Sequence, residues 1–472
     1  MLRRREGRAR SCSKVRLTVV SRPLRVSRAC VAACFLLLLP GLAAPAVAQL
    51  LPPRRQGLPS GPFLLFPSVS FEASHDSNVL YRSSDLSEGV VGSDIVFIRP
   101  RIMVELPIGR NRLRWAYSPQ YRDYSSDQFQ QSNRISHFFD FDANLKLGPS
   151  VTCVVRDHMF RGSIEVDQVD RGGELTFGLI PFVIQSAGAE IGLDLGARQG
   201  ISVLPSYESV RFEETGEQRL FNYRRRGFEG RYNFRLSEPT TLYVFSSYEG
   251  TQQDREELIF GQVEAASHRA GVGLRRVVNQ SVMTQISAGY QNLKFVGGTG
   301  SRFSGLGLDG TISVRLGELA SLEISALRQP LQSFFINNNY YVAEQLRLAL
   351  RHQVSRGMLY TAGVTYYRNS YPDPLDIRVT SETPAGEDQN PANGFIDDFE
   401  AFLPSQGIER SDSGIRLEAG VGYQFGPNMR AFFGYNQERR GSNILEVISG
   451  SLVSPFDYRV NRLSLRFEVG WL

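Results

Sequence analysis

Cysteine is scarce in this chain of 472 residues, and its positions limit the sulfur chemistry that the protein can use. Three of the four cysteines lie within the first 34 residues, which leaves Cys153 alone in the remainder. One thiol can form neither an intramolecular disulfide nor a cysteine-based metal site. Long apolar runs are scarce too, because beyond residue 62 none approaches the roughly 18 residues that a membrane helix needs. The sequence therefore excludes a disulfide-stapled scaffold and a helical membrane domain.

The first 48 residues have the layout of a secretory signal peptide. They hold ten basic side chains and one acidic one, and the basic residues all precede the apolar run 31–39. Helix-breaking prolines and a small-residue site ending at Ala48 follow. A membrane anchor is the alternative, but two prolines interrupt it and its strongly apolar core is only about nine residues long. We predict a signal peptide over 1–48, cleaved after Ala48, and a periplasmic linker over 49–61.

The formal net charge of +5 comes from this leader. Without residues 1–48, 43 lysines and arginines stand against 47 aspartates and glutamates. Nucleic-acid binding needs a basic patch on the folded domain, and the remaining composition does not provide the excess of positive charge that would make one. We therefore expect no nucleic-acid partner.

From Pro62 onward, apolar and polar residues alternate in segments of about ten to fourteen residues, and no long stretch has the 3.6-residue period of a helix. In 96–106, aliphatic residues and Pro100 occupy the even positions, whereas Arg99, Arg101 and Glu105 occupy odd ones. Residues 306–316 and 415–425 repeat the pattern. A water-soluble sandwich would alternate in the same way with its apolar face inside, so the alternation alone predicts strands without choosing between the two folds.

The lengths of the links between the segments favour a membrane barrel. About eighteen segments follow Pro62, and long links alternate with short ones, as outward loops and periplasmic turns do in outer-membrane barrels. Because lipid offers no hydrogen bonds to a free strand edge, such a sheet must close on itself. We predict an all-β fold, a transmembrane antiparallel outer-membrane β-barrel of about 18 strands over residues 62–472. The long links include 76–93, 124–133, 160–180, 212–222, 250–263, 332–339, 371–411 and 440–456, and the short ones include 109–111, 148–150, 197–199, 237–239, 279–280, 317–318, 355–357 and 426–428.

The chain ends in a segment with the pattern of a barrel-closing strand. From Leu463 to Trp471, apolar residues alternate with serine, arginine, glutamate and glycine. We expect this strand to pair with the first strand near 63–74 and to bind the barrel-assembly machinery, although Leu472 stands where an aromatic residue is usual. Tyrosines at segment ends predict interfacial girdles in contact with outer-membrane lipid and lipopolysaccharide, namely Tyr117, Tyr121, Tyr232, Tyr290, Tyr367 and Tyr423.

Charged residues at the alternate positions predict a polar interior. If the apolar face meets lipid, the other face must hold water or ion pairs, because burying a charge dry is costly. These charges are either ladders that brace the wall or an arginine-lined path for an anionic or sugar-like solute, since guanidinium forks bind carboxylates well. The residues predicted to line the interior are Arg99, Arg101, Arg114, Arg122, Arg231, Arg275, Arg315, Arg347, Arg416, Arg466, Glu105, Glu229, Asp309, Glu418 and Glu468.

Candidate catalytic and metal-binding groups are few. The sequence has five histidines and no Gly-x-Ser-x-Gly motif, so we predict no enzyme, no catalytic residue and no cofactor. In a barrel hydrolase, His75 and His158 would be the first candidates, because each lies beside an aspartate. In the acidic link 371–411, residues 387–398 place oxygen ligands close together and could hold Ca²⁺. They do not match the EF-hand spacing, and a solvated outward loop is the alternative.

The first segment and its link, Phe66–Tyr81, resemble the opening of the putative β-barrel porin 2 family. Members begin with a proline-containing strand that leads to a Tyr-Asp-x-Asn-like step, and His75-Asp76-Ser77-Asn78 stands in that place here. Val460–Leu463 is similar to the family's close. Several relatives are encoded with exopolysaccharide synthesis and export systems, and they are thought to form the outer-membrane exit.

The resemblance implies a porin-like barrel in the bacterial outer membrane that forms a polar channel, an exit for exported polysaccharide, with polysaccharide-export components as partners. Two alternatives remain at this point. One is a structural or adhesive barrel with a plugged lumen, and the other is a barrel hydrolase.

Overall fold

A computed structural model describes residues 57–84, 89–129, 135–163, 181–213, 222–254, 264–278, 281–296, 302–333, 340–355, 357–374, 408–444, 446–448, 451–454 and 456–471. The chain divides into two units, Met1–Ala48 and Gln49–Leu472, and all of these residues belong to the second. The signal peptide lies outside the described residues, so cleavage after Ala48 stays a prediction. No helix in these ranges is long and apolar enough to cross a membrane.

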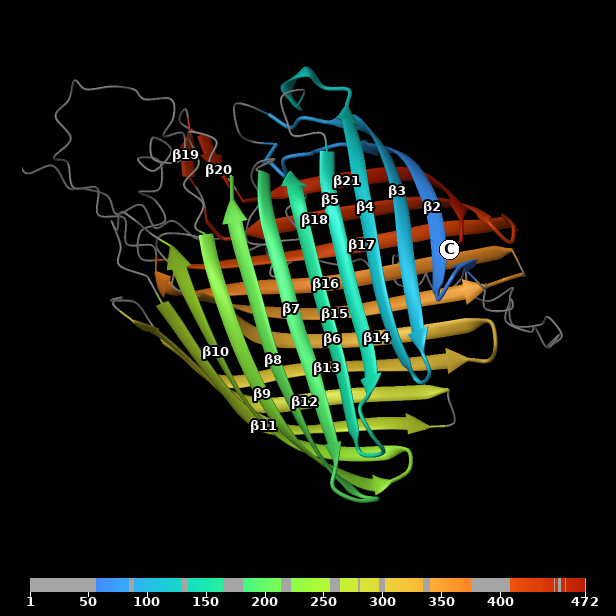
Figure 1. Ribbon diagram of the computed structural model, residues 1–472. Helices are drawn as coiled ribbons and strands as arrows, with labels where there is room; N and C mark the ends of the chain where they lie inside the picture. The colour runs from blue at the N-terminus through green and yellow to red at the C-terminus, as the bar shows by residue number, and fades with distance from the viewer. Residues whose placement is uncertain are drawn as a thin grey trace, which may run out of the picture. The chain divides into compact units, whose positions relative to one another are not determined.

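Long strands joined by alternating short and long links dominate the described part of the chain (Figure 1). Most have 13 to 16 residues, more than the about 9–11 that a tilted strand needs to cross a bilayer. The strands are β2 Phe63–Asp76, β3 Ser93–Ile108, β4 Asn111–Tyr124, β5 Ile135–Lys146, β6 Val151–Ser163, β7 Pro181–Asp194, β8 Gln199–Phe212, β9 Asn222–Ser237, β10 Thr240–Asp254, β11 Glu264–Val278, β12 Val282–Val296, β13 Phe303–Leu316, β14 Ala320–Gln332, β15 Tyr340–Gln353, β16 Met358–Pro374, β17 Glu409–Gly426, β18 Met429–Ser442 and β21 Tyr458–Gly470.

Short elements accompany the long strands. A 3₁₀ turn, η2, spans Asp127–Phe129, and β19 (Glu446–Ile448) pairs with β20 (Ser451–Val453) as a separate two-stranded sheet. β1 (Leu58–Ser60) pairs with the start of β2. The expected linker 49–61 therefore ends in a hairpin, because Leu58–Ser60 lie in register with Phe63–Leu65 and form backbone hydrogen bonds with them.

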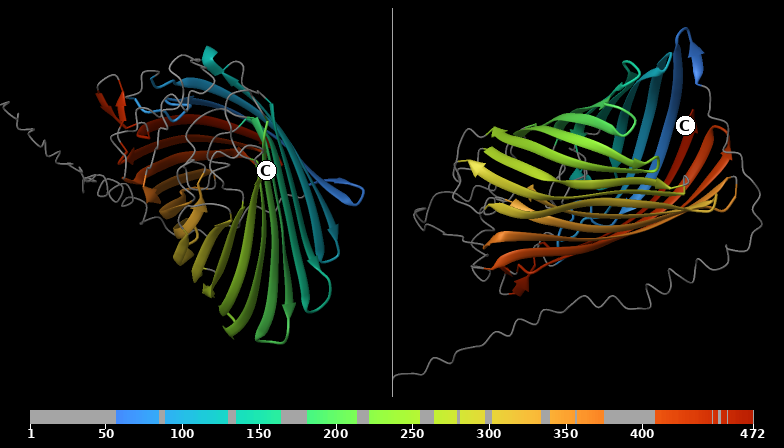
Figure 2. Two further views of the ribbon diagram at one scale, coloured as in Figure 1. Left: turned by 90° about the vertical axis from the view of Figure 1, so that its left-hand side faces the viewer. Right: turned by 90° about the horizontal axis from the view of Figure 1, so that it is seen from below.

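The sheet closes between its first and last long strands. Each of the eighteen long strands pairs antiparallel with the next, and β21 pairs with both β18 and β2. The closing register runs from Ser68 opposite Gly470 to Asp76 opposite Arg462. In Figure 2 the first strands, drawn in blue, lie next to the last strands, drawn in red. The predicted barrel of about 18 strands and the predicted pairing of the last strand with the first are confirmed.

The two faces of this sheet differ in chemistry all the way round the ring. Glu105 of β3 marks one face of the sheet. The residues that stand opposite one another in each successive strand pair share this face, and the pairing can be followed through every strand and back to β2. We call this the polar face. The opposite, apolar face carries large hydrophobic side chains that are exposed, such as Val96, Val244 and Leu346. Water would oppose this arrangement, and lipid favours it.

Five of the six tyrosines expected in the girdles lie on the apolar face, but Tyr117 and Tyr290 lie near the middle of β4 and β12 and not at strand ends, so the girdles stay a prediction. Tyr117, Tyr121, Tyr232, Tyr290 and Tyr423 are exposed on the apolar face. Tyr367 was wrongly placed: it lies on the polar face, where its hydroxyl donates to Glu438 Oε1 at 3.0 Å. The side chains of neighbouring strand residues point to opposite faces, and exposed Tyr366 takes the apolar position instead.

Aromatic rings on the polar face cover glycines of the neighbouring strand. Tyr243 stands opposite Gly273, and Tyr367 stands opposite Gly414. A Cβ atom added at either glycine would come within 2.1 to 2.3 Å of the tyrosine ring, so no larger residue fits without a shift. Such aromatic–glycine pairs protect the bare backbone and help to fix the register of curved sheets.

Candidate functional site

All fifteen residues that the sequence singled out lie on the polar face, by the register of the strand pairs. They divide into those held by an ion pair, those held by other polar or aromatic contacts, and those without an ion-pair partner. This division could not be predicted, because it depends on which side chain stands opposite on the next strand.

Cross-strand ion pairs hold about half of the predicted set. Arg114 Nε donates to Glu105 Oε2 at 2.7 Å, and the two residues face each other across the β3–β4 hairpin. The other cross-strand pairs are Arg347 with Glu418 (3.6 Å), Arg416 with Glu438 (2.8 Å) and Arg466 with Glu72 (2.9 Å). Two further pairs lie along a single strand, Arg231 with Glu229 on β9 and Arg466 with Glu468 (3.6 Å) on β21. Arg430 also pairs with Glu468. These contacts are the bracing ladders that the sequence predicted as one alternative.

Aromatic rings hold a second group of arginines. The Arg99 guanidinium lies 4.8 Å from the centre of the Phe138 ring and donates to Gln120 Oε1 at 2.7 Å. The Arg122 guanidinium lies 5.0 Å from the Phe97 ring. Stacking of this kind is compatible with hydrogen bonds in the plane of the same guanidinium group, such as the one from Arg99 to Gln120.

A third group has no ion-pair partner within 4.0 Å among the described residues. It includes Arg101, Arg275, Arg315 and Asp309, all of which are exposed. Arg101 lies near the Asp140 carboxylate, which feels its charge. Arg275 and Arg315 lie near the ends of their strands that enter short turns.

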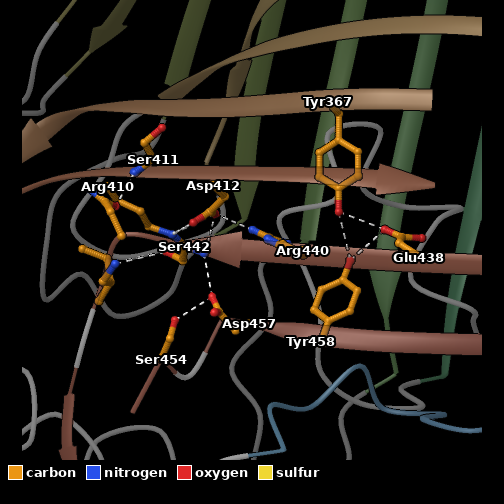
Figure 3. A network of polar contacts seen from close by, with 12 residues as sticks. Tyr367, Arg410, Ser411, Asp412, Glu438, Arg440, Ser442, Ser454, Asp457 and Tyr458 are labelled. Carbon is orange, nitrogen blue, oxygen red and sulfur yellow. Dashed lines mark hydrogen bonds and ion pairs between the residues drawn. The ribbon is translucent and has the colours of Figure 1, made fainter. Parts of the chain in front are cut away.

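The sequence did not predict a cluster of deeply buried charges on this face, which is shown in Figure 3. Arg440 and Asp412 are fully buried side by side, and Arg440 Nη2 donates to Asp412 Oδ2. Arg410 Nε donates to both carboxylate oxygens of Asp412 at 3.0 and 3.1 Å. The Arg410 guanidinium also stacks 3.6 Å from the centre of the Phe456 ring. One carboxylate thus holds two buried guanidinium groups, and an aromatic ring shields one of them.

Polar contacts continue from this cluster to the link between β18 and β21 (Figure 3). Ser442 N donates to Asp457 Oδ1 at 2.6 Å, and Ser454 Oγ donates to the same oxygen at 2.8 Å. Tyr458 and Tyr367 both donate to Glu438 Oε1, at 2.9 and 3.0 Å. Through these hydrogen bonds, Ser454, Asp457 and Tyr458 bind to the polar face. They do so at the end of β16, β17 and β18 where the long links lie.

Comparison with models of protein families shows which family of barrels the chain belongs to. The model described as putative beta-barrel porin 2 matches residues 52–376, which is more than half of the chain. The chain belongs to the putative β-barrel porin 2 family. It is a porin-like outer-membrane β-barrel, as the resemblance implied. The matched range ends before β17, β18 and β21, so it does not test the similarity expected near Val460–Leu463.

Solved structures similar to this family member are outer-membrane proteins of low identity. The outer membrane protein OpdK from Pseudomonas aeruginosa is 10% identical, with 86% of this chain and 99% of that chain covered and a TM-score of 0.45. The siderophore receptor PirA from Acinetobacter baumannii is 10% identical, with 86% and 80% covered and a TM-score of 0.42. TM-scores this low add nothing to the assignment. No curated protein matches the chain.

One row of this porin-family barrel has the residue types of a hydrolase relay. Asp140, His158 and Ser186 are cross-strand neighbours on β5, β6 and β7, and His158 Nδ1 lies 2.7 Å from Asp140 Oδ1. Ser186 Oγ, however, donates to Glu208 Oε2 at 3.3 Å, and no hydrogen bond joins it to His158 in the described structure. A nucleophile needs its base within hydrogen-bond reach, so the row does not form an activated serine.

His75, the other histidine considered, lies on the apolar face, where its Nδ1 is 2.7 Å from Asp94 Oδ1. The Ca²⁺ candidate 387–398 lies outside the described residues. Within the described ranges, no three His, Cys, Asp or Glu side chains gather as metal ligands would.

Proposed function

We propose that the polar face lines a water-filled channel through the outer membrane, and that exported polysaccharide leaves the cell through it. The observation that carries the proposal is the constant separation of charged and apolar side chains around a closed ring of eighteen strands. Lipid accommodates the apolar face, whereas guanidinium and carboxylate groups need water or partners. A ring of this size encloses more space than wall side chains fill.

A sugar polymer as the cargo is supported by the kind of groups on the polar face. Arginines stacked on rings, such as Arg99 on Phe138 and Arg231 beside Tyr243, offer planar donors next to aromatic carbon. Sugar hydroxyl and carboxylate groups accept from such donors. The resemblance to a family whose relatives are encoded with exopolysaccharide export systems supports the same cargo by analogy.

A barrel with a plugged lumen is a second candidate, because parts of the polar face are shielded from solvent. Phe160, Phe182 and Phe212 form a ladder across β6, β7 and β8, with ring centres 5.0 and 6.1 Å apart. All three are buried, and so are Arg440 and Asp412 further round the ring. A structural or adhesive barrel would keep such cover in place permanently.

Conductance in planar bilayers separates the two candidates. We expect the protein to fractionate with the outer membrane, to migrate faster on a gel before heating than after it, and to give discrete single-channel conductance. Folded protein that gives no conductance would contradict the channel and favour the plugged barrel.

Polysaccharide export has its own measurement. In the native bacterium, removal of the gene is expected to leave polymer in the periplasm and to reduce it on the cell surface. Unchanged surface polymer would contradict this cargo while leaving the channel intact.

We also propose three sets of partners. Outer-membrane lipid and lipopolysaccharide would contact the apolar face, the barrel-assembly machinery would bind β21, and polysaccharide-export components would meet the periplasmic end. The alternation of Leu463, Leu465 and Phe467 with polar residues in β21 supports the second of these.

A further inference from the structure

Four successive hairpins carry an arginine on the polar face close to their short turns. Arg235 lies on β9, Arg275 on β11, Arg315 on β13 and Arg351 on β15, each within four residues of the end of its strand. The short turns lie at the same end of the sheet as the end of the chain, since Gly470 N donates to Asn428 O in the β17–β18 turn. In an outer-membrane barrel this is the periplasmic end. We call these four residues the arginine arc.

The arc consists of two pairs in register. Arg235 and Arg275 both stand opposite Thr241 of β10, one on each side of it. Arg315 and Arg351 flank Ser321 of β14 in the same way. Adjacent strands are about 4.8 Å apart, so the backbones of each pair are about 10 Å apart. A small hydroxyl side chain between two arginines leaves both guanidinium groups accessible and adds a donor.

The arc differs from the bracing arginines elsewhere on the polar face in having no carboxylate partners among the described residues. All four side chains are exposed, and none forms an ion pair within 4.0 Å among the described residues. Arg235 Nη1 donates to the Ala197 carbonyl at 3.2 Å. Glu323 lies on β14 between the strands of Arg315 and Arg351 and pairs with neither. Elsewhere, Arg114, Arg416 and Arg466 are neutralised by glutamates at 2.7 to 2.9 Å.

We infer that the arginine arc is a docking site for an anionic polymer at the periplasmic mouth, and that the exported polysaccharide carries carboxylate groups. The inference rests on the proposed function for the direction of transport and the sugar chemistry. Two pairs of unneutralised guanidinium forks can bind carboxylates in bidentate fashion. Repeated charges along a polymer engage both pairs at once, which raises the effective affinity well above that for one carboxylate. A single small anion would gain no such advantage.

Binding of polygalacturonate to the full-length protein folded in detergent tests the inference without requiring transport. At low salt we expect saturable binding that weakens as salt rises, and no binding of uncharged dextran. Replacing Arg275, Arg315 and Arg351 together by glutamine is expected to weaken binding about tenfold, since each exposed ion pair contributes modestly. The matching triple lysine variant is expected to keep most of the affinity.

Arg276→Gln is the matched control, because Arg276 neighbours Arg275 on the same strand but points to the apolar face. It is expected to bind polygalacturonate as the wild type does. Wild-type affinity in the triple glutamine variant, or no binding by the wild type at low salt, would overturn the inference. Binding without conductance would instead overturn the proposed channel and leave the arc as an anion site.

Discussion

Replacing Asp412 by asparagine is expected to lower the free energy of unfolding of the barrel by about 3–5 kcal/mol, the usual cost of removing one partner from a buried ion pair. The Asp412 carboxylate is the shared acceptor of Arg410 and Arg440, whose side chains are 3% and 0% exposed. Without it, two positive charges lose the carboxylate that they share, in a site that water does not reach. Denaturant unfolding of the detergent-folded protein, followed by tryptophan fluorescence, measures the change.

Asp309→Asn is the matched control for this prediction. Asp309 is a polar-face carboxylate that is exposed and has no ion pair among the described residues. Its replacement is expected to change the free energy of unfolding by less than about 0.5 kcal/mol. If Asp412→Asn unfolded at the same denaturant concentration as Asp309→Asn, the cluster would have to be hydrated, and its contribution to stability would be that of a surface pair.

The buried cluster also shows where sequence reasoning stops. Glu105 and Arg114 are nine residues apart across a tight turn, so alternation and turn position together predict that they share a face. Arg410, Asp412 and Arg440 fall at the edges of the links predicted over 371–411 and 440–456. In the structure β17 begins at Glu409 and β18 runs to Ser442, so these residues still belong to strands. Nothing local in the sequence shows that the pairing continues so far.

Tyr367 is a different kind of error, since the information needed to place it was present in the sequence. Arg347 and Thr365 share a register row on the polar face, and Tyr367 is two residues beyond Thr365 on the same strand. Counting alternate residues would have assigned Tyr367 to the polar face. Its residue type suggests an interfacial tyrosine, but its register places it among the polar-face residues. At this position, period-two alternation predicts the face correctly and residue type does not.

The arginine arc follows from two kinds of information together, the period-two alternation in the sequence and the register between strands in the structure. Alternation in the sequence predicts that Arg275 and Arg315 lie on the polar face. It predicts the same for arginines that form ion pairs with glutamates in the structure. Whether a guanidinium is neutralised depends on the residue opposite, and that residue follows from the register between strands. Ser321 stands between Arg315 and Arg351, whereas Glu418 lies near Arg347. Charge composition alone could not separate the bracing arginines from the available ones.

Replacing Ile324 by arginine tests which face of the sheet meets lipid, and it is expected to cost about 2–4 kcal/mol of folding free energy in a bilayer. Ile324 is exposed on the apolar face, and its cross-strand neighbours are Ile312 and Leu348. It lies five residues beyond the turn at 317–319, which places it about 12 Å along the barrel axis from that turn for a strand tilted at about 45°. A charge at that depth has no water and no partner.

Thr311→Arg supplies the comparison, because it adds the same charge on the polar face of the neighbouring strand, two residues from Asp309. In a water-filled channel this arginine is hydrated and close to a carboxylate, so its effect is expected to stay below about 1 kcal/mol. Unfolding of both variants in lipid vesicles gives the difference directly. Equal losses would mean that the two faces meet similar surroundings, which is incompatible with lipid on one side and water on the other. A larger loss for Thr311→Arg would instead place a packed, dry plug against the polar face, as the plugged barrel requires.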